Sequence, residues 1–211
     1  MEEYSGIWDR CKRHLQKGRT VDLMHARISL DFALQLLDKL GGDPDIVIPA
    51  TMLHDIGFAM IESENLEQKT INPETASSKE AYSSILRERH LVEGKRLSES
   101  ILKEVHYQEA LIGPIVGIVG DHEDALGRAP SDRNNRNKVI VSDADKLYRY
   151  CAHAFFSMID IHKASAEELF SNLLYKMDDW LITDYARRIA FDELRKVPNS
   201  ERLSQLLDIQ V

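Results

Sequence analysis

The sequence predicts an all-α fold, a single-domain helical bundle, and three observations support this prediction. Apolar residues recur at every third or fourth position through most of the chain, which is the spacing of one helix face. No segment combines the period-two alternation and the turn residues of a β-hairpin. The 211 residues contain no internal repeat and no low-complexity linker, so we expect residues 1–211 to form one domain.

The first two helices are predicted from apolar spacing and from the glycines that follow them. Gly18 ends a short opening helix, which is indicated by three apolar residues four positions apart: Ile7, Cys11 and Leu15. Residues 22–40 keep helical spacing and form the second predicted helix. Asp22 is its candidate N-cap, and Gly41-Gly42 is its terminator.

A third helix is predicted to begin at Pro44, because proline is favoured in the first helical turn and Asp43 before it is a good cap. Pro49 has no amide hydrogen to donate, so we expect a kink or a restart of the helix there. The helix then passes through a His-Asp pair and ends near Gly57.

Two polar, aperiodic segments are predicted as loops, residues 62–78 and residues 123–137. The first of them is long enough to fold over a site. Helices are predicted between the two loops over residues 79–105 and 109–120, and His122 lies at the end of the second helix.

The C-terminal third is predicted to be helical as well. Residues 138–162 are largely apolar, and Ser165 and Glu168 have the spacing of a capping box. Residues 169–197 are predicted as one long amphipathic helix, with a short helix in the tail. We expect an apolar stripe on that helix to pack against the protein's own core, with a homodimer contact as the alternative. The stripe consists of Leu173, Met177, Trp180 and Leu181.

The composition argues against several classes of protein. Asp and Glu number 35 against 27 Lys and Arg, a net charge of -8, whereas a groove for a nucleic-acid polymer needs a positive field. Cys11 and Cys151 are too few for a disulfide framework, which predicts a reducing cytoplasm. The N-terminus lacks the pattern of a signal peptide. We expect no membrane span, because apolar stretches such as residues 111–119 fall short of the roughly 20 residues needed.

Aspartates in apolar surroundings carry the predicted chemistry. His54-Asp55 stands in the run ATMLHDIGF, where a buried, ionised carboxylate needs a cation. Asp145 has the same need in VIVSDADKLY, and Asp143, two positions away, faces another direction on a helix. Imidazole and carboxylate are good ligands for divalent transition metals, and side chains from several helices of a bundle can converge on one ion. Further candidate ligands on separate helices or at their ends are His25, His90 and His122.

The order of these residues resembles the HD-domain superfamily of metal-dependent hydrolases, whose pattern is His, His-Asp, His, His and Asp. The pattern covers about residues 22–150, with a C-terminal helical extension over about residues 165–211. Asp145 is chosen over Asp143 because it stands in the Ala-Asp-basic-Leu context typical of the family's last aspartate. The matching segments are LMHARIS with His25, MLHDIG with His54 and Asp55, RHLVEG with His90, GDHED with His122 and DADKL with Asp145.

The resemblance implies a metal centre with one or two divalent transition-metal ions per chain, with iron or manganese expected first. Members of the family that lack the middle histidines bind one ion, and this chain retains both, so we expect two. The resemblance also implies that Asp55 bridges the two ions. The first ion would be held by His25, His54, Asp55 and Asp145, and the second by His90 and His122.

The resemblance implies a phosphohydrolase that cleaves a phosphoester or phosphoanhydride of a small phosphorylated metabolite, with a nucleotide as the leading substrate. Two metal ions would convert water into a metal-bound hydroxide, which Asp55 positions, and basic side chains would stabilise the charge of the transition state. For the basic side chains on the loop predicted over residues 123–137, the alternative is that they are solvated surface residues that do not bind substrate. The candidate substrate-binding residues are Arg128, Arg133, Arg136, Lys138 and Lys146.

Two sequence features argue against one class of substrate, and two functions other than phosphate hydrolysis stay open. Phe58 follows HDIG at the position where the cyclic dinucleotide phosphodiesterases of the superfamily commonly carry lysine. Those enzymes also have a Gly-Tyr-Pro element after the fourth histidine, and none follows His122 here. Both differences disfavour a cyclic-di-GMP phosphodiesterase. The same six ligands occur in di-iron oxygenases of the superfamily, and a non-catalytic metal- or nucleotide-binding module is a third reading. Two roles, orienting an imidazole or being a solvated charge, stay open for Asp121, Glu123 and Asp143.

Overall fold

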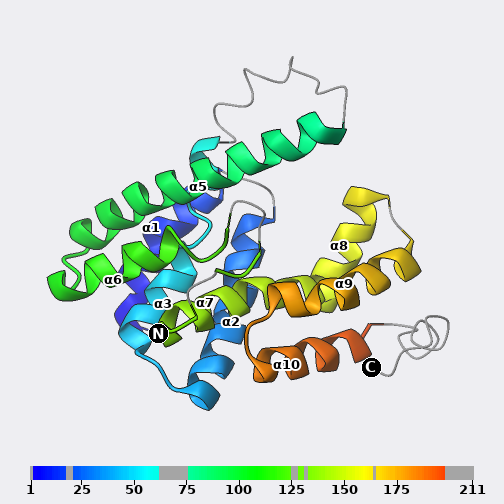
Figure 1. Ribbon diagram of the computed structural model, residues 1–211. Helices are drawn as coiled ribbons and strands as arrows, with labels where there is room; N and C mark the ends of the chain where they lie inside the picture. The colour runs from blue at the N-terminus through cyan, green and yellow to red at the C-terminus, as the bar shows by residue number, and fades with distance from the viewer. Residues whose placement is uncertain are drawn as a thin grey trace.

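Helices α2 (Asp22–Leu40) and α7 (Arg136–Leu147) pack against each other near the middle of the computed structural model (Figure 1). The structure describes residues 2–17, 21–61, 76–124, 128–130, 133–163 and 165–197. These residues form helices, turns and irregular connections but no strand, which confirms the predicted all-α fold.

The N-terminal helices agree closely with the prediction. A short 3-10 turn, η1 (Glu2–Tyr4), and helix α1 (Ser5–Leu15) come first, and α2 then has the predicted bounds. α2 ends at Gly41 and Gly42, whose φ angles of 69° and 150° are accessible to glycine and strained for other residues. The predicted N-cap is wrong, because Asp22 is itself the first helical residue and is buried.

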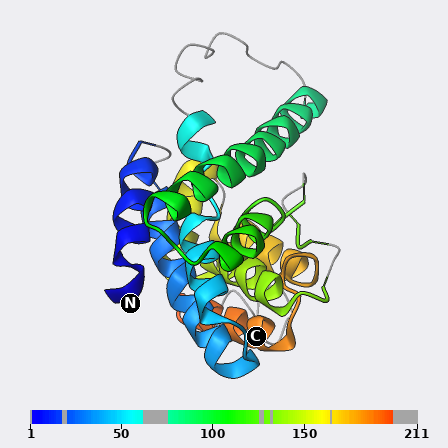
Figure 2. The same ribbon diagram turned by 90° about the vertical axis from the view of Figure 1, so that its left-hand side faces the viewer.

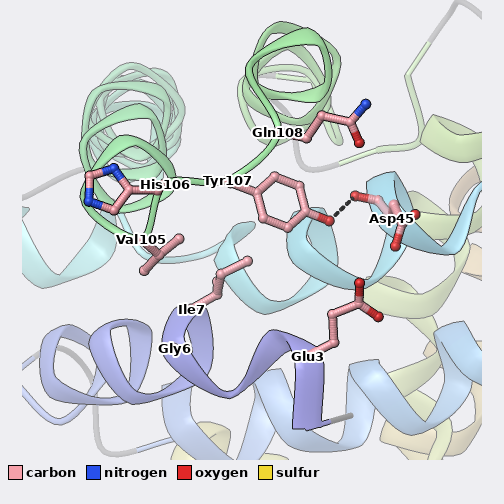
Figure 3. A pocket seen from close by; sticks show the side chains of 8 residues that line it. All are labelled: Glu3, Gly6, Ile7, Asp45, Val105, His106, Tyr107 and Gln108. Carbon is pink, nitrogen blue, oxygen red and sulfur yellow. Dashed lines mark hydrogen bonds between the residues drawn. The ribbon is translucent and has the colours of Figure 1, made fainter.

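Helix α3 (Pro44–Leu53) begins as predicted, since the Asp43 carboxylate accepts a hydrogen bond from Asp45 N at 3.0 Å. The predicted restart at Pro49 does not occur. Proline leaves the carbonyl of Asp45, four residues earlier, without its helical donor. The Tyr107 hydroxyl donates to that carbonyl at 2.7 Å, as Figure 3 shows, so a distant part of the chain supplies the missing bond.

Helices α5 (Ala76–Glu104) and α6 (Glu109–Val119) pack against each other along one side of the bundle (Figure 1 and Figure 2). Most of the loop predicted over residues 62–78 falls on residues 62–75, which lie outside the described residues. Its last three residues belong to the first turn of α5, so this helix begins earlier than predicted.

Helix α7 is followed by the 3-10 turn η2 (Tyr148–Tyr150) and by α8 (Ala152–His162). Every residue from 138 to 147 is buried, because α7 packs against α2, α3 and α10 (Asp184–Arg195) at the same time. The charged residues of α7 from Lys138 onward are therefore enclosed by protein, and each needs a partner within the bundle.

The C-terminal helices depart from the prediction at one point. The capping box of Ser165 and Glu168 is confirmed, and it begins α9 (Ala166–Trp180). The single helix predicted over residues 169–197 is wrong, because the chain leaves the helix after α9 and starts α10 at Asp184. The predicted tail helix lies outside the described residues.

The break between α9 and α10 is held by a buried carboxylate of α7. Asp143 accepts hydrogen bonds from Ile182 N at 2.6 Å, from Thr183 N at 3.1 Å and from Thr183 Oγ1 at 2.6 Å. The Thr183 hydroxyl in turn caps α10 by accepting from Ala186 N at 3.1 Å. These bonds replace the helical ones that the break gives up.

Replacing Thr183 by alanine is expected to lower the free energy of unfolding by about 1–2 kcal/mol, because a helix cap is lost. The change also removes one of the bonds to Asp143. Thr183→Ser keeps the hydroxyl and is expected to cost clearly less. Urea unfolding followed by circular dichroism gives both values, and equal losses in the two variants would contradict the role of the hydroxyl.

Helices α8, α9 and α10 lie together at one end of the bundle (Figure 1). Leu173, Met177 and Leu181 are at most 4% exposed, so this part of the predicted stripe packs against the protein's own core. Trp180 is half-buried, and the guanidinium carbon of Arg149 lies 4.9 Å from the centroid of its ring.

The segment Pro44–Ile61 is longer than the apolar stretch over residues 111–119. With 18 residues, it is long enough and apolar enough to cross a membrane. In the fold, 72% of this segment is buried. It forms α3, the turn over residues 54–57 and the helical residues 58–61, so its position in the core explains its apolar character.

Candidate metal centre

The fold brings the six predicted metal ligands into one buried cluster. Each of these residues is at most 7% exposed, although they come from five separate parts of the chain. They are His25 in the first turn of α2, His54 and Asp55 directly after α3, His90 on α5, His122 just beyond α6, and Asp145 on α7.

Asp55 lies between two pairs of histidines, and each of its carboxylate oxygens faces one pair. Oδ2 lies 3.1 Å from His25 Nδ1 and 3.8 Å from His54 Nε2. Oδ1 lies 3.7 Å from His90 Nε2 and 3.9 Å from His122 Nε2. Each pair forms with Asp55 a group whose ligand atoms are within 4.8 Å of one another. A carboxylate that bridges two cations has this arrangement.

Two of the imidazole rings are oriented by the backbone. His54 Nδ1 lies 2.7 Å from the Thr51 carbonyl oxygen, and His122 Nδ1 lies 2.9 Å from that of Val119. Because a carbonyl oxygen only accepts, Nδ1 is the donor in both rings. Nε2 of both rings is buried without a hydrogen-bond partner in the described part of the chain. Metal-binding histidines are commonly held in this way by a backbone carbonyl.

Each of the two groups that share Asp55 could hold a divalent ion, whereas Asp145 lies in neither group and faces His25 Nε2. Nitrogen and oxygen donors in combination suit iron, manganese and other first-row ions. Ligands bonded at about 2.1 Å to one ion lie roughly 3–3.5 Å apart. The separations of 3.7–3.9 Å between histidine nitrogens and aspartate oxygens are slightly wider, so a bound ion would require these side chains to lie a few tenths of an ångström closer together.

The carboxylates of the cluster attract positive charge. Burial acts to lower the pKa of His54, but the charges of Asp55 and Asp145 outweigh it and raise that pKa to about 9. The pKa of His25 is also raised against burial, since its ring lies 3.0 Å from Asp145 and 3.1 Å from Asp55. Burial and the neighbouring His54 lower the pKa of His122. Protons and metal ions therefore compete for the same positions.

A chain of ion pairs extends from Asp145. Lys146 Nζ donates to Asp145 Oδ2 at 2.6 Å and to Glu123 Oε2 at 2.5 Å, and all three side chains are buried. Arg87 Nη1 donates to Glu123 Oε1 at 2.8 Å. Burial acts to raise the pKa of Glu123, but Lys146 and the other neighbouring positive charges hold it at about 2. Glu123 is therefore an ionised part of the site and not a solvated charge.

The other two acidic residues left open by the sequence have different partners. Asp143 binds the turn before α10, and burial raises its pKa to about 6 against the hydrogen bonds that it accepts there. Asp121 is exposed and pairs with Lys138. Sequence reasoning missed Arg87. The available signal was its position three residues before His90, which places both side chains on one face of a helix.

The five basic residues predicted to bind substrate are not gathered in one place. Arg128, Arg133 and Arg136 are exposed. Arg136 and Lys138 lie at the start of α7, about 11–14 Å along the helix axis from Asp145 at 1.5 Å per residue. Lys146 alone among the five stands next to a predicted ligand in the sequence, and its ammonium contacts that ligand, Asp145.

Aromatic side chains hold two further rings of the cluster. Tyr148 stacks on His25 with ring centroids 4.4 Å apart, and Phe58 stacks on His90 at 4.2 Å with only 11° between the ring planes. Phe58 thus supports a candidate ligand at the position where related phosphodiesterases carry lysine. Phenylalanine in place of lysine at position 58 therefore has a structural role, which is to stack on the His90 ring.

Gly57 allows the turn after α3 to lie directly on α5. A Cβ atom at this position would lie 2.0 Å from the His90 carbonyl oxygen and 2.6 Å from Gly94 N. Both are backbone atoms and cannot rotate away. The close approach holds the His54-Asp55 pair next to His90, so the glycine of the HDIG segment serves the geometry of the site.

A separate cavity of about 340 Å³ lies between η1, α1, the start of α3 and the turn from α5 to α6 (Figure 3). Glu3, Asp45 and Tyr107 are among the residues that line it, and none of the six predicted ligands does. The chemistry of the cluster therefore does not extend to this cavity.

One of three comparisons with known proteins identifies a family for this chain. A family model described as HD domain matches residues 23–150, which is more than half of the chain and includes all six residues of the cluster. A comparison with curated proteins and one with solved structures found no match. On the family match, and with the all-α fold that such domains have, the chain belongs to the HD domain family.

Proposed function

We propose that this protein is a metal-dependent phosphohydrolase that cleaves a phosphoester or phosphoanhydride of a small phosphorylated metabolite, with nucleotides as the first class to test. The observation that supports this proposal most strongly is the position of Asp55, each of whose oxygens faces a different pair of histidines. Membership of the HD domain family, which consists mostly of hydrolases, supports it independently.

The proposed centre holds two divalent ions, iron or manganese. When bound, they would supply Lewis acidity, which lowers the pKa of water and neutralises charge on a phosphoryl group. The chain's own residues contribute orientation. Asp55 offers one oxygen to each group of histidines, and Asp145 offers Oδ1, which lies 3.0 Å from His25 Nε2. Backbone carbonyls hold His54 and His122 with Nε2 directed into the cluster.

The charge of the site favours an anionic substrate. Two divalent ions against Asp55 and Asp145 leave about +2, and the Lys146–Glu123 pair adds nothing to this sum. Because the protein as a whole carries -8, a small anion that enters the site singly suits it better than a polyanion does. This distribution supports a phosphorylated metabolite as the substrate.

The proposal is tested by loading the protein with Mn²⁺ or Fe²⁺ and measuring release of inorganic phosphate and pyrophosphate from a panel of nucleotides and sugar phosphates. We expect phosphate or pyrophosphate release that is equal in air and under anaerobic conditions. The double variant His54→Ala, Asp55→Ala should release none, whereas Asp38→Asn, an exposed aspartate on α2, should behave as wild type.

Three results would contradict the proposal. Turnover that stops without dioxygen would indicate the oxygenase chemistry that the same ligands also permit. Binding of metal and nucleotide without any turnover across the panel would indicate a binding module. Undiminished phosphate release by the double variant would place the activity outside the cluster.

A further inference from the structure

The cluster contains a third group of ligand atoms besides the two that share Asp55. His122, Glu123 and Asp145 each offer one nitrogen or oxygen atom, and these atoms lie within 4.8 Å of one another. All three residues are buried. It has one histidine and two carboxylates, where each of the other two groups has two histidines and one carboxylate. It shares His122 and Asp145 with the six predicted ligands, and its atoms are of the types that bind a divalent cation.

A lysine ammonium lies between the two carboxylates of this third group. Lys146 Nζ is 2.5 Å from Glu123 Oε2 and 2.6 Å from Asp145 Oδ2. The Lys146 side chain is 0% exposed, so these carboxylates replace the water that would surround an ammonium group at the surface. The other carboxylate oxygen of Asp145, Oδ1, is directed at the histidines. It lies 3.0 Å from His25 Nε2 and 3.7 Å from His54 Nε2.

We infer that Lys146 is a tethered cation, which occupies the third cation position of the cluster and holds Asp145 so that only Oδ1 faces the histidines. The inference rests on the proposed metal centre. It gives Lys146 a positioning role, in place of the contact with substrate that the sequence suggested. A divalent ion bound to Glu123 and Asp145 would lie within a few ångströms of the ammonium charge, and their repulsion excludes it.

Removal of this charge is therefore expected to create a metal site. Lys146→Met keeps an unbranched side chain that ends near the position of Lys146 Cε, and it leaves Glu123 and Asp145 without the ammonium group between them. In equilibrium dialysis against Mn²⁺, we expect Lys146→Met to bind one Mn²⁺ per chain more than wild type. The melting temperature of the variant should also rise more on addition of Mn²⁺ than that of wild type, since the ion replaces the lost charge.

The matched control is the double variant Lys146→Met, Glu123→Gln, which removes one carboxylate together with the lysine. It is expected to bind as many Mn²⁺ ions as wild type. A folded Lys146→Met variant with the wild-type number of ions would overturn the inference. So would a Lys146→Met variant that stays unfolded in Mn²⁺ while the double variant folds, because the third position would then not accept the ion.

The same measurement separates the two proposals. A wild-type protein that binds no Mn²⁺, and no Fe²⁺ in the same dialysis under anaerobic conditions, would contradict the metal centre itself. A wild-type protein that binds Mn²⁺ and a folded Lys146→Met variant that binds no additional ion would contradict the role of Lys146 alone.

Discussion

Replacing Gly57 by alanine is expected to lower the free energy of unfolding by more than about 3 kcal/mol and to reduce the amount of bound metal. The added Cβ would lie 2.0 Å from the His90 carbonyl oxygen and 2.6 Å from Gly94 N. Since both are backbone atoms of α5, that helix must shift to relieve the contact. α5 carries His90, so its displacement also separates this ring from Asp55.

Chemical denaturation and elemental analysis of the same preparation test this prediction. The matched control is Gly113→Ala on α6, where an added Cβ meets no atom within 4 Å. That variant should keep its metal and gain up to about 1 kcal/mol, because alanine is the better helix former. A Gly57→Ala protein with the wild-type unfolding midpoint and metal content would show that the close approach is not required.

The second large effect is expected from Asp55→Asn, which keeps the shape of the side chain and removes its charge. We expect kcat/KM for phosphate release to fall at least about 1,000-fold, which corresponds to about 4 kcal/mol of transition-state stabilisation. The reason is that both oxygens of Asp55 face candidate ligand groups, so the two groups lose their common charge together.

Metal content distinguishes this effect from a general loss of structure. Asp55→Asn should retain the helical circular dichroism spectrum and lose bound metal, whereas the exposed Asp38→Asn on α2 should change neither. Retention of wild-type activity by Asp55→Asn would rule out Asp55 as the shared residue of the site.

Local signals predict most of the helices correctly because their determinants are close in sequence. The bounds of α2 follow from its apolar spacing and from Gly41-Gly42, and the start of α9 follows from Ser165 and Glu168. The break before α10 has a different origin. It depends on Asp143, which lies 39 residues before Ile182 and meets it only in the folded chain. The spacing of apolar residues along 169–197 contains no information about that contact.

The same distinction applies to the uninterrupted helix at Pro49. A proline within a helix predicts an interruption from local chemistry alone. The donor that satisfies the Asp45 carbonyl is Tyr107, 62 residues away. Sequence reasoning identifies the unsatisfied carbonyl but not the residue that compensates for it.

Some features of the candidate site can be predicted from the sequence, and others can be seen only in the structure. Its six predicted ligands could be identified because their types and order follow a family pattern, and the fold places them together. The division of Asp55 between two pairs of histidines requires coordinates, since it depends on how four helices and their ends meet. Lys146 could be recognised as a basic neighbour of Asp145, but its pairing with Glu123, 23 residues earlier, becomes evident only in the structure.

The most direct test of the account is elemental analysis of the purified protein, before and after reconstitution with Fe²⁺ or Mn²⁺. We expect close to two divalent ions per chain, one for each group of histidines that shares Asp55. A value near one would remove His90 and His122 from the set of ligands. Protein that binds no metal, even after reconstitution, would contradict the central claim that this buried cluster is a metal centre.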